Sequence, residues 1–238
     1  MLVRRSCLSF LPVLLLIHMR FSGALYVRSP EKLDLLKRTV EYYDPATGGG
    51  SMLTNTGNGL GEPLNSRERR YISPDVLTDR GFLNYAQSVG FDEECFNIHI
   101  GNPQSTNLDD GNGWVNQTIL LREDYGISNI CTCLQSLVGE NHFRLFRQNG
   151  PIANRGALFL AVSHEENAFE SHTISPDGYN RERDELVSLA IRGQTSSDGV
   201  TYSTISEDVS GLLVADAIGI NHGIAIDGIV KVLTVMII

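Results

Sequence analysis

The densest group of side chains that could perform chemistry lies between residues 164 and 172. It contains two histidines and three glutamates: His164, Glu165, Glu166, Glu170 and His172. On a helix, positions 164 and 172 would face roughly the same way, so these imidazoles and the downstream His222 could hold a metal ion. The spacing differs from the His-Glu-x-x-His pattern of zinc hydrolases, and a solvated acidic surface with incidental histidines explains the same residues.

No other motif points to catalysis. The chain contains no Gly-x-Ser-x-Gly nucleophile elbow, no Gly-x-Gly-x-x-Gly loop and no P-loop. We therefore expect a protein without enzymatic activity and without a cofactor. A secreted hydrolase or fungal effector with a metal site at His164, His172 and His222 is the alternative.

The charge distribution excludes one class of partner and divides the chain in two. The 238 residues carry a formal charge of −9 with a pI near 5.1, which argues against nucleic-acid binding. Residues 1–70 hold 10 of the 19 basic side chains and only 6 of the 28 acidic ones. The remaining part, 71–238, has a net charge of −13, so a basic segment precedes an acidic domain.

Residues 1–24 have the form of a secretory signal peptide. Two arginines precede a short apolar core over 8–17, and small residues allow cleavage after Ala24. A membrane anchor is the alternative reading, but the apolar stretch is too short to span a bilayer, and Pro12 interrupts it. The sequence therefore predicts a secreted protein.

Residues 25–70 have the composition of a pro-region. The stretch from Asp44 to Glu62 is rich in Gly, Thr and Asn, so we expect it to form an exposed linker. Two dibasic pairs, Lys37-Arg38 and Arg69-Arg70, are candidate sites for a processing protease of the late secretory pathway. Such proteases have acidic pockets that recognise consecutive positive side chains. The predicted functional domain is then 71–238.

Cysteine usage and one sequon agree with secretion. Cys95, Cys131 and Cys133 remain after signal removal, and a bridge between the last two would be strained. We therefore expect Cys95 to pair with one of the other two. Asn116 begins the one acceptor sequon, Asn-Gln-Thr, and is a candidate for N-glycosylation.

The pattern after residue 71 predicts an α+β domain. Apolar spacing indicates helices over 74–88 and 181–192, and short apolar runs at 143–146 and 157–162 indicate a pair of buried strands. The expected fold class is a small secreted α+β domain with antiparallel strands, two or three helices and a C-terminal β-hairpin.

The C-terminal tail is the most distinctive segment. From Leu212 to Ile238 the charged side chains are Asp216, Asp227 and Lys231, and bulky apolar residues alternate with small ones. Asp227-Gly228 between β-branched runs predicts a hairpin turn. The tail is either a buried hairpin or a membrane-active segment, and both hold if it is released at a target membrane. The candidate membrane-active residues are Ile218, Ile220, Ile224, Ile226, Ile229, Val230, Val232, Leu233, Val235 and Ile237.

Taken together, these features resemble the precursors of virus-encoded yeast killer toxins. The resemblance rests on the signal ending near Ala24, the dibasic pairs, the single sequon and the apolar tail. It implies a preprotoxin that is cut by a processing protease and secreted as a non-enzymatic toxin. Such a toxin would bind a yeast cell-wall mannoprotein and then permeabilise the sterol-containing plasma membrane.

This chain departs from the pattern of those precursors in two respects. No dibasic pair follows Arg70, so the toxin would start at Tyr71 or be released by a different cleavage. The resemblance also implies a helical, membrane-inserting C-terminus, whereas the alternation in the tail predicts a hairpin.

Overall fold

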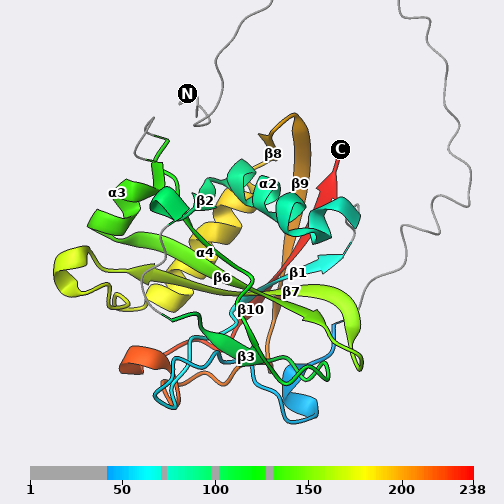
Figure 1. Cartoon of the computed structure of the whole chain (residues 1–238), viewed down its shortest axis with the longest axis vertical. Helices are drawn as coiled ribbons and strands as arrows, with labels where there is room; N and C mark the ends of the chain where they lie inside the picture. Colours follow the sequence, from blue (N-terminus) through cyan, green and yellow to red (C-terminus); the bar gives the residue numbers. More distant parts are fainter. Residues whose placement is uncertain (1–41, 71–73, 98–101, 127–130) are drawn as a thin grey trace, which may run out of the picture.

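An eight-stranded β-sheet organises the computed structural model, which describes residues 42–70, 74–97, 102–126 and 131–238 (Figure 1). Its strands are β1 (Ser66–Arg70), β2 (Phe91–Glu93), β5 (Ile119–Glu123), β6 (Glu140–Asn149), β7 (Asn154–Glu165), β8 (Gln194–Ser197), β9 (Val200–Val209) and β10 (Val230–Ile237). They lie in the order β2-β5-β6-β7-β1-β10-β9-β8. Neighbouring strands are antiparallel, except that β1 runs parallel to β10.

Three α-helices and a two-stranded ribbon complete the described residues. The helices are α2 (Asp79–Val89), α3 (Cys131–Val138) and α4 (Gly178–Ile191). The ribbon pairs β3 (Ser105–Asn107) with β4 (Trp114–Asn116). Five short 3-10 turns are η1 (Pro45–Thr47), η2 (Pro74–Leu77), η3 (Cys95–Asn97), η4 (Ala168–Glu170) and η5 (Asn221–Gly223). The chain is thus a mixed α and β structure around one large sheet.

Helix α2 begins and ends where local chemistry favours it. The Thr78 hydroxyl caps the helix by accepting a hydrogen bond from the Gly81 amide, and Gly90 ends it in a left-handed conformation at φ 100°. The expected helix over 74–88 is therefore divided at Thr78 into η2 and α2. The expected helix over 181–192 is confirmed as α4, with its start three residues earlier, at Gly178.

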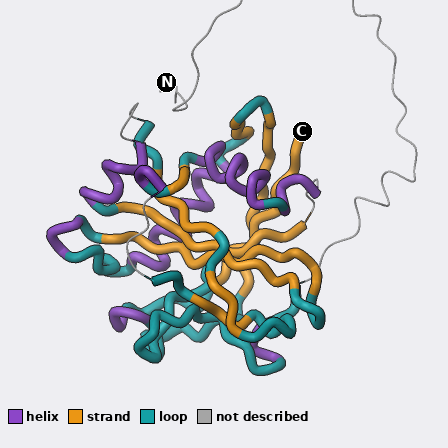
Figure 2. The backbone as a smooth tube through the Cα atoms, viewed as in Figure 1, coloured by secondary structure: helices purple, strands orange, loops and turns teal. Residues whose placement is uncertain are grey.

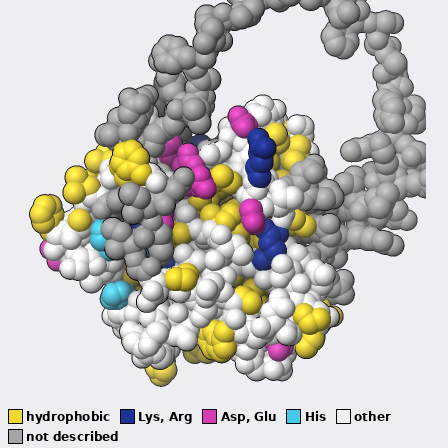
Figure 3. All heavy atoms as spheres, in the orientation of Figure 1, with side chains coloured by type: hydrophobic (Ala, Val, Ile, Leu, Met, Phe, Trp, Pro, Cys, Tyr) yellow, Lys and Arg dark blue, Asp and Glu magenta, His cyan; other side chains and the backbone are white. Residues whose placement is uncertain are grey.

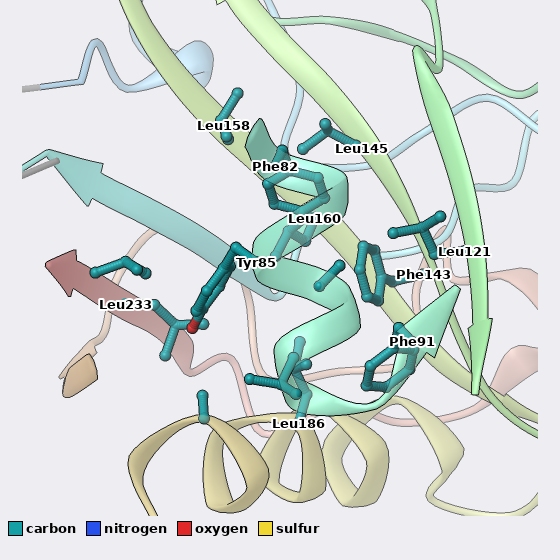
Figure 4. Packing of buried hydrophobic residues seen from close by; sticks show 14 of the residues in the cluster. Phe82, Tyr85, Phe91, Leu121, Phe143, Leu145, Leu158, Leu160, Leu186 and Leu233 are labelled. Atoms are coloured by element: carbon teal, nitrogen blue, oxygen red, sulfur yellow. The ribbon is translucent and has the colours of Figure 1, made fainter. Parts of the chain in front are cut away.

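One face of the sheet packs against α2 and α4, and Figure 2 shows most of the helices on this side and long loops on the other. Figure 4 shows Phe82 and Tyr85 of α2 lying over Phe143 of β6 and Leu160 of β7, with Leu186 of α4 beside them. Phe82 and Phe143 meet edge to face, with ring centroids 5.9 Å apart. The strands expected at 143–146 and 157–162 are confirmed inside β6 and β7.

The opposite face of the sheet is covered by loops, and one of them is the expected linker. Met52 and Thr54 are buried in this segment, and Glu62 ends it as a buried side chain. The expectation of an exposed linker over 44–62 is therefore confirmed only in part: residues 46–49, 55 and 57–60 are exposed, but the segment is anchored by its buried residues. Met52 and Leu53 belong to the apolar cluster that includes Phe146 and Phe159 of the sheet, and the backbone of the segment bonds to neighbouring loops.

The expected processing motif Arg67-Glu68-Arg69-Arg70 forms strand β1 in the interior of the sheet. Arg67 lies over the ring of Tyr42 and is 3% exposed, and Glu68 is 4% exposed. The expected domain boundary after Arg70 therefore runs through the end of a strand that belongs to the folded domain. The sites at Ala24, Lys37 and Arg38, and the signal peptide, lie outside the described residues.

The C-terminal hairpin is confirmed only in part. β10 pairs antiparallel with β9, which precedes it in the chain, but a connection over 210–229 joins them in place of a tight turn. The turn expected at Asp227-Gly228 with a strand over 224–226 is wrong. The Asp227 carboxylate accepts two hydrogen bonds from Arg183 of α4, at 2.7 and 2.9 Å, which ties this dipeptide to the helix.

Candidate functional site

A network of buried charges lies on the loop-covered face of β5, β6 and β7. The strand register places Arg122, His142 and Ser163 opposite one another, with Arg144 next along β6. Successive side chains of a strand point to opposite faces, so these residues share the face that α2 and α4 do not cover. Glu165 at the end of β7 completes the group.

Two arginines connect this network to segments that are far away in sequence. Arg122 donates to Glu165 at 2.7 Å and to Gln135 of α3 at 2.9 Å, and it pairs with Glu94 at 3.1 Å. Arg144 donates to Glu62 at 2.7 Å. Since Glu62 also accepts from Gln104 at 2.7 Å, Arg144 joins the N-terminal segment and the 102–118 loop to the sheet.

Burial and neighbouring charges shift the two central titratable groups in the same direction. Burial lowers the pKa of His142 to about 3, although the Glu165 carboxylate opposes this shift. Burial of Glu165 would raise its pKa, but the charge and hydrogen bond of Arg122, with the charge of Arg144, hold the pKa below its usual value. The imidazole is therefore neutral and the carboxylate ionised over the ordinary pH range.

The serine, histidine and glutamate of the network do not form a catalytic triad. Ser163 Oγ lies 3.3 Å from His142 Nε2, and Glu165 Oε1 lies 3.5 Å from the same nitrogen. A triad needs the hydroxyl and the carboxylate on opposite ring nitrogens, so that the acid orients the base. Here Arg144 also meets Nε2, at 2.8 Å, while the buried Nδ1 has no hydrogen-bond partner. This arrangement can hold segments together but cannot activate the serine.

The three histidines of the alternative metal site are engaged separately. His164 Nδ1 lies 2.9 Å from Glu182 of α4, whereas His172 Nδ1 lies 3.4 Å from Glu165, on the other face of the sheet. His222 is exposed in η5, in a left-handed conformation. Within the part of the chain that the structure describes, no group of three His, Cys, Asp or Glu side chains is arranged to hold a metal ion.

The covalent and glycan candidates are placed as follows. A disulfide joins Cys95 of η3 to Cys133 of α3, which is one of the two pairings that the sequence left open.

Asn116, the first residue of the sequon, ends β4 and has an exposed side chain. Trp114, two residues earlier in the same strand, is 57% exposed. The sequon is thus accessible to a glycosyltransferase in the folded chain.

A second candidate region is an end of the molecule formed by loops that carry almost no charge. We call it the uncharged end, and it consists of residues 46–61 and 210–226. The first segment has no charged residue, and the second has Asp216 as its one acidic side chain and no Lys or Arg. Figure 3 shows few charged side chains over the lower part of the molecule, where these loops lie.

Backbone hydrogen bonds hold the two segments of the uncharged end together. The Gly61 amide donates to the Gly219 carbonyl at 2.9 Å, and the Asn221 amide donates to the Gly61 carbonyl at 2.8 Å. Val214 and Ile218 then stand in solvent at 79% and 81% exposure, and Leu60 is also exposed. Exposed aliphatic side chains on an uncharged surface are typical of contact with another apolar surface.

The candidate membrane-active residues are divided between this end and the core. Ile218 and Ile237 are exposed, and Ile224 and Ile229 are half-buried. The other six are buried in the sheet or beneath the loops: Ile220, Ile226, Val230, Val232, Leu233 and Val235. Among the described residues, no helix combines the length and apolar character needed to cross a membrane.

Sequence reasoning missed Leu60 and Val214 as exposed apolar side chains. The signal in the sequence was the absence of positively charged residues around them, since each lies in a run with no Lys or Arg. Comparison of the chain with protein-family models, with curated proteins and with solved structures found no match in any of the three.

Proposed function

We propose that this chain is a secreted killer toxin that binds the cell wall of sensitive yeasts and permeabilises their plasma membrane. It is made as a preprotoxin, its processing protease cuts at the dibasic sites, and a cell-wall mannoprotein is its first receptor. The observation that carries the proposal is the uncharged end, with Val214 and Ile218 exposed at its surface.

Charge supports a bilayer as the surface that this end meets. The chain after residue 70 has a net charge of −13, so an anionic surface repels it as a whole. The uncharged end carries Asp216 as its one acidic side chain, so it contributes little to this repulsion. Its aliphatic side chains favour binding by about 25 cal/mol for each Å² of apolar surface removed from water. Such a surface fits a neutral, sterol-containing membrane better than an anionic one.

The fold supports a particular order of events at the membrane. Val232, Leu233 and Val235 are core residues of β10, so inserting the tail would require removing a strand from the sheet. Loop residues 214 and 218 need no such change. In the secreted α+β domain that we propose, the long connection of the β9–β10 hairpin makes the first contact, and any release of β10 follows it.

Substitution of the two exposed residues tests this proposal. We expect the Val214→Asp/Ile218→Asp double variant to cause at least tenfold less dye leakage from neutral phosphatidylcholine–ergosterol vesicles than the parent chain, because buried carboxylates are costly in a bilayer. Folding should be unaffected, since both side chains are in solvent. Vesicle leakage by the secreted protein at pH 4.5 is the measurement.

A matched control comes from another exposed apolar residue. Phe169 in η4 is 91% exposed and lies outside the uncharged end, so Phe169→Asp should leave leakage unchanged. A parent protein that causes no leakage at any acidic pH would contradict the permeabilising mechanism. Equal leakage by the parent and the double variant would contradict the role of this surface.

A further inference from the structure

Strand β1 joins the two halves of the main sheet. It pairs with β10 along all five of its residues and with β7 through Ser66, Arg67 and Glu68. Removing it would leave β7 and β10 with unpaired edges in the middle of the sheet. Unpaired backbone groups in such a position are costly and promote aggregation.

The residue before β1 is bonded on several sides. The Asn65 amide group donates to the carbonyls of Val162 and Tyr179, at 2.9 and 2.8 Å. Its side-chain oxygen accepts from the Val162 amide, and its own carbonyl accepts from the Lys231 amide, both at 3.0 Å. Since Asn65 is 2% exposed, these hydrogen bonds are shielded from water. Hydrogen bonds to water could replace them only if the core opened.

The rest of the N-terminal segment is also part of the core. Met52 and Leu64 are buried in the cluster that includes Phe146 and Phe159. Glu62 is held by Arg144, as described above. Burial of two large apolar side chains contributes about 3–6 kcal/mol relative to leaving them in water.

No disulfide can link residues 25–70 to the rest of the chain. Residues 25–70 contain no cysteine, and both cysteines of the disulfide follow Arg70. If the chain is cut after Arg70, non-covalent contacts alone hold the two pieces together.

We infer that a chain cut after Arg70 persists as a two-chain protein, in which the piece ending at Arg70 stays bound as strand β1 and its preceding segment. The inference rests on the processing site of the proposed function. It assigns residues 42–70 the role of a subunit that completes the sheet, in place of a pro-region that is discarded.

A directed cut in the folded chain tests this inference. A recognition sequence for a site-specific protease is inserted directly after Arg70 in the chain that begins at Leu25 and so lacks Cys7, and the purified protein is cut with that protease. We expect both pieces to elute together at the size of the intact chain, and a non-reducing denaturing gel to separate them. Elution of the piece ending at Arg70 on its own would overturn the inference.

Two asparagines in the same segment give a matched pair of variants. Asn65→Ala should speed the release of the smaller piece at least tenfold, because it removes the side-chain bonds to β7 and α4. Asn58→Ala should leave release unchanged, because Asn58 bonds only to Thr56 and Leu60 nearby. Equal release rates of the smaller piece from both variants would count against the buried Asn65 contacts as a cause of its retention.

This experiment separates the inference from the proposed function. Co-elution requires neither a membrane nor the natural processing protease. A chain whose pieces stay together but that causes no vesicle leakage would therefore retain the two-chain inference and lose the toxin proposal.

Discussion

At pH 8, the Glu68→Gln variant is expected to be more stable than the parent chain by roughly 4 kcal/mol, whereas the two should be nearly equal at pH 4.5. Glu68 points from β1 into the helix-covered core, and neither of its carboxylate oxygens has a hydrogen-bond partner. Burial raises the pKa of Glu68 from 4.5 to about 8, although Arg147 partly opposes the shift.

The sign of the effect follows from the direction of that shift. Because the pKa of Glu68 is higher in the folded chain than in the unfolded chain, the protonated form favours folding. Its full contribution is present below about pH 4.5 and is lost as the pH rises through about 8. Glutamine cannot ionise, so the variant should lack this pH dependence.

The groups that face Glu68 do not remove the effect. Tyr85 of α2 and Tyr202 of β9 both have a pKa that burial raises, so they stay neutral near pH 8. The Tyr85 hydroxyl is bonded to Thr204, at 3.0 Å. Arg147 is engaged by Asp79 at 2.7 Å and by the Leu77 carbonyl. Among the side chains that the structure describes, none is therefore placed to pair with an ionised Glu68.

Urea unfolding of the parent and the variant from pH 4 to pH 9 measures this difference. Glu170→Gln is the control, since Glu170 is exposed in η4 and should change stability by less than about 0.5 kcal/mol at any pH. A stability difference between Glu68→Gln and the parent that is the same at pH 8 as at pH 4.5 would contradict the prediction.

Glu165 limits stability on the acidic side of the same range. Burial opposes its ionisation, but Arg122 and Arg144 hold its pKa below 4.5, so its contribution is present above about pH 4.5 and is lost as the pH falls below that value. Burial also lowers the pKa of His142 from 6.5 to about 3, so stability falls as the pH drops below about 6.5, and together with Glu68 this places the greatest stability between about pH 4.5 and 6.5. That range suits a protein proposed to act in acidic surroundings.

The second large effect is expected at the buried ion pair of Arg144 and Glu62. Arg144→Met should lower the free energy of unfolding by about 3–5 kcal/mol, because it leaves the buried Glu62 carboxylate without its cation. The N-terminal segment should loosen first, since Glu62 is one of its anchors. Chemical denaturation at pH 7 measures the change, and hydrogen exchange of residues 52–64 locates it.

A double variant and an exposed pair supply the controls for this prediction. Arg144→Met/Glu62→Gln should recover part of the loss, because no uncompensated charge remains. Lys231→Met should cost less than about 1 kcal/mol, because its partners Asp208 and Asp184 are largely exposed. Similar losses for Arg144→Met and Lys231→Met would show that burial of the pair does not determine the effect.

The local sequence pattern was sufficient to predict helices and strands whose formation depends on residues close to them in the chain. The short apolar runs at 143–146 and 157–162 match β6 and β7, because a strand buried on both faces needs apolar residues in succession. Helix α4 was found from its apolar face, and the end of α2 from Gly90. The disulfide partner of Cys95 was narrowed to two by the strain of a Cys131–Cys133 bridge.

The candidate site depended on contacts that local pattern does not contain. Arg144 and Glu62 are 82 residues apart, and nothing near either of them indicates the other. The alternative metal site requires His164 and His172 to lie on one face of a helix. They lie on opposite faces of a sheet, because His164 and Glu165 are successive residues of β7 and His172 contacts the second of them.

The sequence by itself determined that a basic, cysteine-free front precedes an acidic chain with an almost uncharged tail, since charge and composition need no fold. Tertiary structure alone decided that Arg67-Glu68-Arg69-Arg70 is an interior strand and that the glycine-rich segment before it is an anchor. The physical reason is that strand pairing is non-local. A polar segment becomes part of a core when distant strands offer it two unpaired edges and buried partners for its charges.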